Sequence, residues 1–271
     1  MMGFLKMVTP PASPPAKRSR RQRRVMANGD GLPVFLPKEV KDIKDPFARA
    51  LAQRIVRIPV PLQMGNFKGC VMSSCIKPIV QQHDKSPVVL LHCFDSSCLE
   101  WRRTYPLLEQ ASLETWAIDV LGWGFSDLEK LPPCDAASKR HHLFELWKAY
   151  IKRPMILVGP SLGATVAVDF TATYPEAVDK LVLINANAYS EGTGGLKDLP
   201  KSIAYAGINH KTLIVCSEND QIVSNQLSVK LLCELQNAVF REVPDSGHLP
   251  HVENPKQFVK LISDFVSGKI N

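Results

Sequence analysis

The chain lacks the long apolar segments that mark membrane and secreted proteins. No stretch reaches the ~18 uninterrupted apolar residues of a membrane-spanning helix. The best one, residues 155–168, is broken by a turn of its own. The first 29 residues also lack the apolar core of a secretory signal. We therefore expect neither a bilayer span nor a secretory leader in these residues.

Paired cysteines are missing as well. The number of cysteines is odd and no C-x-x-C pair occurs among them, so nothing indicates a disulfide framework. Reduced thiols in a non-secretory compartment are expected. The spacings within Cys70/Cys75 and Cys93/Cys98 do not match a zinc knuckle, so we expect no metal site, and no cofactor. The seven cysteines are at positions 70, 75, 93, 98, 134, 216 and 233.

Acidic residues are absent from residues 1–29, which hold seven of the 33 lysines and arginines. The other 26 basic residues are equal in number to the 26 acidic residues. The chain from Asp30 onward is therefore neutral, although the net charge of the whole chain is +7. A nucleic-acid-binding face is therefore not expected there. The Arg- and Pro-rich tail favours a transit peptide and a chloroplast location. A mitochondrial transit peptide, a nuclear signal in K-R-S-R-R-Q-R-R and a solvated cytoplasmic tail remain alternatives.

Short apolar runs alternate with helical patterns along the rest of the chain. The central runs are apolar throughout, which is typical of parallel strands covered on both faces. This alternation predicts an α/β fold with a doubly wound, mostly parallel sheet. Residues 30–86 form an N-terminal extension with a helix from Asp45/Pro46 and an antiparallel strand pair, and residues 87–271 form the core. Strands are expected at 54–60, 69–76, 87–92, 115–119, 155–159, 180–185, 212–216 and 238–243, and helices around 99–111, 136–151, 162–174, 224–236 and 255–267.

A serine between two glycines follows the fifth of these runs. The stretch I-L-V-G-P-S-L-G-A places Ser161 where a buried-type strand passes into the helix that Leu162 opens. Such a turn holds a serine hydroxyl exposed, and Gly159 and Gly163 let neighbouring backbone pass close by. The helix N-terminus favours negative charge beside the hydroxyl. We therefore predict that Ser161 is a nucleophile and that the backbone N–H of Leu162 donates to an oxyanion.

A serine nucleophile needs a base and an orienting acid, which in this architecture follow in the order Ser, Asp, His. Asp220 lies just after the run T-L-I-V-C, and His248 just after A-V-F-R-E-V. Two successive strands thus deliver an acid and a histidine to the sheet edge that carries Ser161. Glu218 in place of Asp220, and His251 in place of His248, remain alternatives.

Five motifs occur in a fixed order between residues 87 and 271. They are L-L-H-C-F-D-S-S-C-L-E-W-R (90–102), D-V-L-G-W-G-F-S-D (119–127), G-P-S-L-G (159–163), N-D-Q-I-V (219–223) and S-G-H-L-P-H-V-E-N-P (246–255). With them the chain resembles the α/β-hydrolase superfamily, and within it the small esterase-like members of plant plastids. The resemblance implies a sheet of the α/β-hydrolase type. Serine rather than carboxylate at the nucleophile position implies acyl transfer, but the superfamily covers many chemistries.

The resemblance also implies a second oxyanion N–H in the loop after His92, and this maps to Phe94. The family usually has glycine where this chain has Cys93, so that loop departs from the pattern. A thiol there is expected to pack rather than to act as a second nucleophile. The D-V-L-G-W-G-F-S-D motif resembles the family's structural loop, with Gly122 and Gly124 for turns and Asp119 and Ser126 for local hydrogen bonds.

The family usually inserts a helical cap between the sixth and seventh strands, and here residues 186–211 are too few for one. They allow one weak helix near 196–206, interrupted by Pro200. Either the protein is naturally open, or the chain is a shortened form of a capped enzyme, and we favour the second. Loss of a cap exposes apolar surface, which favours peripheral membrane contact. It also admits water to the site.

The leading functional hypothesis is a serine hydrolase of carboxylic esters with a small-molecule or lipid-like substrate, such as a lipophilic plastid ester. An acyltransferase on the same three residues is a second enzymatic alternative. The alternative from another class is a catalytically silent scaffold that binds a ligand or partner. Reactivity of Ser161 toward a fluorophosphonate separates the silent scaffold from the enzymes.

Overall fold

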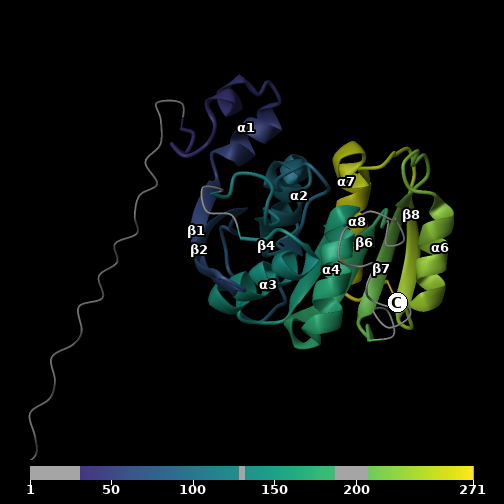
Figure 1. Cartoon of the computed structure of the whole chain (residues 1–271). Helices are drawn as coiled ribbons and strands as arrows, with labels where there is room; N and C mark the ends of the chain where they lie inside the picture. The colour runs from purple at the N-terminus through teal and green to yellow at the C-terminus, as the bar shows by residue number, and fades with distance from the viewer. Residues whose placement is uncertain (1–30, 128–131, 187–206, 271) are drawn as a thin grey trace, which may run out of the picture.

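A computed structural model of the chain describes residues 31–127, 132–186 and 207–270. Within them one eight-stranded sheet runs through the molecule in the order β1-β2-β4-β3-β5-β6-β7-β8 (Figure 1). The strands are β1 (Ile55–Met64), β2 (Phe67–Ile76), β3 (Val88–Leu90), β4 (Thr115–Ile118), β5 (Met155–Pro160), β6 (Val178–Ile184), β7 (Lys211–Ser217) and β8 (Ala238–Val243). The predicted α/β class and the mostly parallel sheet are confirmed.

Strands β3 to β8 pair with one another in parallel, whereas β1 and β2 form an antiparallel hairpin. The hairpin joins the sheet through β2, which is antiparallel to the end of β4. From β3 the chain moves outward to β4 and then returns to β5 on the other side of β3. The order of the strands therefore reverses between β3 and β5, and open α/β sheets bind ligands at the carboxyl ends of the strands at such a point.

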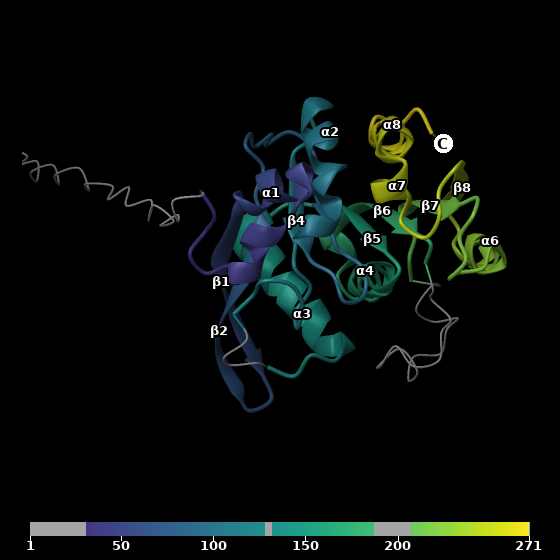
Figure 2. The same cartoon turned by 90° about the horizontal axis from the view of Figure 1, so that it is seen from above.

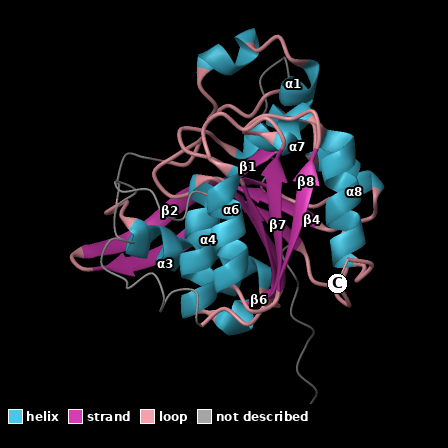
Figure 3. Cartoon of the chain, turned by 90° about the vertical axis from the view of Figure 1, so that its right-hand side faces the viewer, coloured by secondary structure: helices cyan, strands magenta, loops and turns pink. Residues whose placement is uncertain are grey.

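Helices cover both faces of the sheet. Helices α2 and α8 lie on one face, and α3, α4 and α6 lie on the other (Figures 2 and 3). The α-helices are α1 (Pro46–Ala52), α2 (Tyr105–Gln110), α3 (Ala136–Leu146), α4 (Leu162–Thr173), α6 (Asn225–Glu234), α7 (Pro250–Glu253) and α8 (Pro255–Val266). Shorter helical segments are η1 (Lys38–Asp42), η2 (Cys98–Arg102), η3 (Trp147–Ile151) and η4 (Pro175–Ala177).

The central strands β3 and β5 are apolar throughout because each contributes side chains to two cores. Along β3, Val88 and Leu90 pack with residues of α2 and α8, while Val89 packs with residues of α3 and α4. Strand β5 alternates in the same way, with Ile156 in the first core and Leu157 in the second. Successive side chains of a strand point to opposite faces, so a strand covered on both sides must be apolar at every position.

The segment predicted as one helix around 99–111 is two helical pieces, η2 and α2, which meet at Arg103 and Thr104. Pro106 lies in the first turn of α2, where its missing N–H removes no helical hydrogen bond. The helix expected from Asp45 begins as predicted, because the Asp45 carboxylate accepts the N–H of Phe47 and Ala48. The predicted domain division stays a prediction, and the tail (1–29) and most of the shortened crossover (186–211) lie outside the described residues.

Candidate active site

The candidate residues lie in loops that follow four parallel strands. Phe94 follows β3, Ser161 directly follows β5, Asp220 follows β7 and His248 follows β8. The carboxyl ends of parallel strands meet at one edge of a sheet, so residues separated by more than a hundred positions reach the same place. All four residues therefore lie at the carboxyl-end edge of the sheet.

Ser161 lies in a strained turn between β5 and α4. Its backbone has φ +47° and ψ −111°, a conformation that L-residues rarely adopt. The N–H of Ser161 donates to the carbonyl of Ile184 at 3.0 Å and fixes the turn to β6. A Cβ on Gly159 would lie 2.3 Å from the carbonyl oxygen of Gly163, and one on Gly163 would lie 2.8 Å from that of His92. Glycine is therefore required at both positions, because neighbouring backbone passes too close for a side chain, as predicted for a nucleophile turn.

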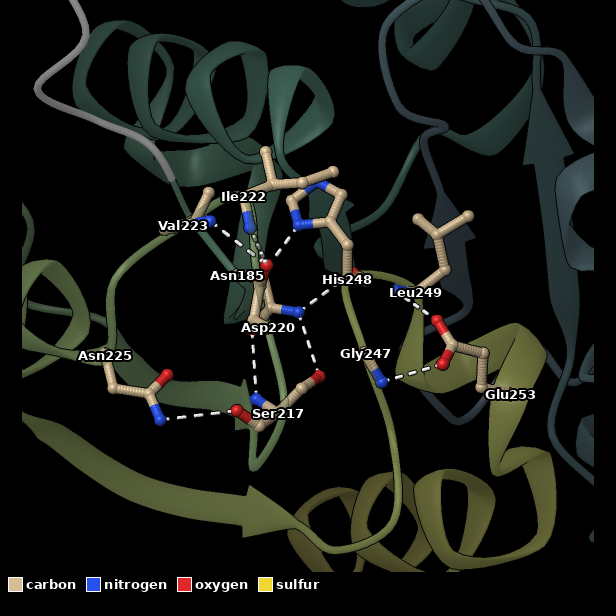
Figure 4. A network of polar contacts seen from close by, with 10 residues as sticks. All are labelled: Asn185, Ser217, Asp220, Ile222, Val223, Asn225, Gly247, His248, Leu249 and Glu253. Atoms are coloured by element: carbon tan, nitrogen blue, oxygen red, sulfur yellow. Dashed lines mark hydrogen bonds and ion pairs between the residues drawn. The ribbon is translucent and has the colours of Figure 1, made fainter.

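His248 and Asp220 are hydrogen-bonded to each other. His248 Nδ1 lies 2.9 Å from Asp220 Oδ2, and the carboxylate side chain is fully buried while the imidazole is 15% exposed (Figure 4). The other oxygen, Oδ1, accepts the N–H of Ile222 at 2.8 Å and of Val223 at 3.0 Å. A carboxylate can only accept, so Nδ1 carries the proton and Nε2 is left as the acceptor.

Within the described residues, no hydrogen bond joins the Ser161 hydroxyl to the His248 imidazole. In sites without substrate such bonds are often long and tighten only when the reacting group is bound. The structure thus brings the acid and the histidine into contact and places the serine on the same rim.

Two residues that the sequence reasoning missed hold the histidine loop in place. Asn185, at the end of β6, donates its amide to the backbone carbonyl of His248 at 2.8 Å and to the hydroxyl of Ser217 at 2.9 Å. Glu253 accepts the N–H groups of Gly247 and Leu249, at 2.7 and 3.0 Å, on either side of His248 (Figure 4). A polar residue closing the apolar run K-L-V-L-I-N was the available signal for Asn185. Glu253 has no comparable signal, because its role depends on a turn.

The two candidate oxyanion donors share one cavity. Leu162 and Phe94 both line a space of about 260 Å³ that extends along α4 past Val166. Among the described residues, neither backbone N–H donates to another backbone carbonyl. The N–H of Cys93, in contrast, already donates to the Glu100 carboxylate at 3.0 Å. Two amides without a backbone acceptor, in residues that line the same cavity, can stabilise negative charge on a carbonyl oxygen.

A pair of aromatic rings separates this cavity from a second, wider space. Phe94 and Trp123 meet edge to face with their centroids 4.8 Å apart, and Phe94 is 66% exposed. Trp123 lines the first cavity and also a groove of about 770 Å³, which runs past Ser97 to Leu249. Trp123 therefore borders two compartments, one that Leu162 also lines, next to Ser161 in the chain, and one that Leu249 also lines, next to His248.

The alternative site residues have other partners. Glu218 is exposed and accepts the N–H of Asp245. His251 is fully buried, and its Nε2 lies 2.8 Å from Glu100 Oε1. Neither is in a position to replace Asp220 or His248. Burial, together with the nearby Glu100, raises the pKa of the Cys93 thiol far above its ordinary value, which opposes a thiolate nucleophile.

The loop interpreted as scaffold is held as expected. Asp119 accepts the backbone N–H of Cys98 and of Phe125, at 2.6 and 2.7 Å. The hydroxyl of Ser126 accepts the N–H of Ser74 at 3.1 Å. Gly122 and Gly124 both have positive φ, which is where glycine is favoured. Among the described residues, no group of three or more His, Cys, Asp or Glu could hold a metal ion, and no helix is long and apolar enough to cross a membrane.

A serine carried on a strand-to-helix turn at the rim of a mostly parallel sheet is the arrangement of α/β hydrolases. The chain belongs to this family. A family profile described as alpha/beta hydrolase fold matches residues 86–197. The alpha/beta hydrolase domain-containing protein VTE7 of Arabidopsis thaliana is 71% identical over 333 aligned positions that cover all of both chains. This chain has 271 residues, so at least 62 of those positions have no counterpart in it.

More distant relatives and solved structures bear lipase and esterase names. The (lyso)-N-acylphosphatidylethanolamine lipase of Mus musculus is 32% identical over 109 residues, which cover 39% of this chain and 31% of that protein. A thermophilic esterase from Thermogutta terrifontis superposes with a TM-score of 0.65 at 17% identity, over 78% of this chain and 98% of its own. A membrane phospholipase A gives a TM-score of 0.64 at 17% identity, over 85% and 90% of the two chains. At such identities the likeness to the solved structures is one of fold.

Proposed function

We propose that the protein is a serine hydrolase of carboxylic esters that works through an acyl-enzyme. Nε2 of His248 takes the proton of the Ser161 hydroxyl as its oxygen attacks the ester carbonyl. The N–H groups of Leu162 and Phe94 donate to the oxyanion, and Asp220 stabilises the imidazolium. His248 then returns the proton to the departing alcohol. A water deprotonated by the same imidazole releases the acid and restores the serine.

The contact between His248 and Asp220 is the observation that carries this proposal. It fixes the imidazole tautomer with Nε2 free, on the same rim as a half-buried serine whose backbone is strained in a strand-to-helix turn. An isolated serine turn could have a purely structural role. A serine turn beside a buried, tautomer-fixing carboxylate is what nucleophilic catalysis requires.

A lipophilic substrate fits the lining of the site. Phe94, Trp123 and Val166 present apolar surface to the cavity beside the serine turn, and apolar lining with a few polar groups is typical of small-molecule sites. The lipase named among the relatives supports the same class of substrate. We extend the proposal to lipophilic esters of the chloroplast, which rests on the basic tail of residues 1–29. Imaging of a fluorescent protein fused to that tail tests the location.

Two alternatives share the same residues. An acyltransferase would pass the acyl group to an acceptor other than water. The 1-acylglycerol-3-phosphate O-acyltransferase ABHD5 of Rattus norvegicus, 25% identical over 156 residues, gives it some support. A silent binding scaffold would leave Ser161 unreactive. The proposal that the cap between β6 and β7 is shortened rests on the short segment of residues 186–211, and loss of a cap would lower activity without removing the reacting residues.

Labelling by a fluorophosphonate, read by intact mass, tests the proposal. The wild type should gain one adduct, and Ser161→Ala and His248→Ala should gain none while keeping the circular-dichroism spectrum of the wild type. A chain-length series of p-nitrophenyl esters then defines the acyl preference. An added alcohol acceptor distinguishes transfer from hydrolysis. A folded wild type that stays unlabelled contradicts both enzymatic proposals and favours the scaffold.

A further inference from the structure

A buried acid–histidine pair lies beneath the candidate site and takes no part in the chemistry proposed above. Glu100 on η2 and His251 on α7 are joined by a 2.8 Å hydrogen bond. Their side chains are 4% and 0% exposed. Charged and polar groups are rarely buried to this extent unless each is paired. The pair connects residues 151 positions apart in the sequence, so it joins two separate loops.

On the acidic side the pair reaches the oxyanion loop. Glu100 Oε2 accepts the N–H of Cys93 at 3.0 Å, and the Ser96 side chain is a further hydrogen-bond partner. Burial by itself raises the pKa of Glu100, but the hydrogen bonds from His251, Ser96 and Cys93 outweigh it and lower the pKa below the ordinary value. Glu100 is therefore ionised near neutral pH, and it binds the peptide that immediately precedes Phe94.

On the histidine side the pair reaches the loop of the candidate base. His251 lies three residues after His248, and its backbone carbonyl accepts the hydroxyl of Thr104. Its ring packs on Trp101 with centroids 4.3 Å apart. Nδ1 of His251 is buried without a hydrogen-bond partner. A carboxylate only accepts, so Nε2 of His251 carries the proton that is donated to Glu100.

We propose that Glu100 and His251 are positioning residues that set the oxyanion loop, residues 92–95, against the histidine loop, residues 245–249. The inference rests on the proposed hydrolase function and deepens it. Because the Cys93 amide is held by Glu100, the orientation of the next amide, that of Phe94, follows from where the carboxylate stands. The carboxylate in turn is held by His251 on α7, the helix that directly follows the loop that carries His248. The pair therefore controls the separation of the oxyanion donor from the base.

A displacement of reacting groups by about 1 Å can cost about a hundredfold in rate. Removal of one oxyanion donor costs about a hundred- to a thousandfold. The variants Glu100→Ala and His251→Leu displace the Phe94 amide without removing it. We therefore expect kcat for p-nitrophenyl butyrate to fall about 10- to 100-fold, with KM changed less than about threefold.

A conservative variant of His251 distinguishes positioning from packing. His251→Gln keeps a donor near Nε2 that can reach the Glu100 carboxylate. It should recover kcat to within about threefold of the wild type. The matched control is His142→Gln, because His142 is also buried and bonded through Nε2, at 2.5 Å from Ser73, on the opposite face of the sheet. It should lower stability and leave kcat unchanged.

All rates are divided by the concentration of fluorophosphonate-reactive sites, so that unfolded protein does not count. If the wild type is labelled and Glu100→Ala keeps its kcat per labelled site, the positioning role is wrong and the hydrolase function stands. A loss of kcat in His251→Leu that His251→Gln does not recover also overturns it, since packing would then explain the effect. A folded wild type that is not labelled overturns the hydrolase function and this inference with it.

Discussion

Replacing Asp220 by asparagine tests how the carboxylate fixes the imidazole. The carboxylate uses both oxygens, Oδ2 for Nδ1 of His248 and Oδ1 for the N–H groups of Ile222 and Val223. Asparagine offers one oxygen and one amino group. If the oxygen stays with the two backbone donors, the amino group faces His248. If the amide flips, the amino group meets two N–H donors, and each buried donor left without a partner costs about 1 to 3 kcal/mol.

The first orientation is therefore favoured by about 2 kcal/mol or more, and in it the amino group donates to Nδ1 of His248. The proton then lies on Nε2, the atom that must accept the proton of Ser161. We expect kcat of Asp220→Asn to fall about a thousand- to ten-thousandfold, equivalent to about 4 to 5 kcal/mol of transition-state stabilisation. The melting temperature should change little, because each hydrogen bond has a replacement.

The assay is p-nitrophenyl butyrate hydrolysis with the rate of fluorophosphonate labelling measured in parallel, since both depend on the same proton transfer. Asp220→Ala is the companion variant. It loses the tautomer control and also the bonds to Ile222 and Val223, so it should be destabilised as well as inactive. A folded Asp220→Asn that keeps more than a tenth of the wild-type rate would refute the reasoning, because the imidazole tautomer would then not depend on this carboxylate.

Three further outcomes are expected. Gly159→Ala should destabilise the fold by more than about 3 kcal/mol in urea denaturation, because its Cβ would lie 2.3 Å from the backbone carbonyl of Gly163. Burial lowers the pKa of His142 to about 4 from 6.5, so the unfolded chain binds more protons between these values. The free energy of unfolding should thus decline as pH falls from 6.5 to 4, by up to about 3 kcal/mol, and His142→Gln should lack most of this decline. Trp123→Ala should merge the two compartments and shift the p-nitrophenyl ester preference toward bulkier acyl groups, and an unchanged preference would contradict the role of this wall.

The fold could be predicted because its strands carry a local signal. Runs such as M-I-L-V and T-L-I-V-C are apolar at every position since both faces of each strand are covered, and this pattern needs no knowledge of long-range contacts. Ser161, Asp220 and His248 were accessible for a related reason. Each directly follows such a run, and parallel strands bring their ends to one edge. The prediction of a single helix around 99–111 was wrong, because two helical segments meet at Arg103 and Thr104. The apolar residues on either side of this junction continue one helical pattern, so the sequence does not mark the break.

The residues that hold the site in place could not be found in this way. Glu100 stands in C-L-E-W-R, and nothing nearby indicates that His251, 151 positions later, is its partner. His251 itself was an alternative base on sequence grounds, because proximity to His248 in the chain does not reveal which ring is buried. Glu253 accepts two amides that become available only when the His248 loop has turned back on itself. Such contacts depend on the assembled fold.

Because β6 pairs directly with β7, the geometry of the site does not depend on the length of the segment that connects these two strands. Five register pairs, from Lys180 with Lys211 to Ile184 with Val215, fix where the segment leaves the sheet and where it returns. With both ends anchored, the entropy of closing the loop grows only with the logarithm of its length, about 0.6 kcal/mol for each doubling. Segments of very different size can therefore be exchanged at this point at small thermodynamic cost. Evolution or protein engineering can therefore change the segment that would cover the substrate. The positions of the residues that would react with the substrate stay the same.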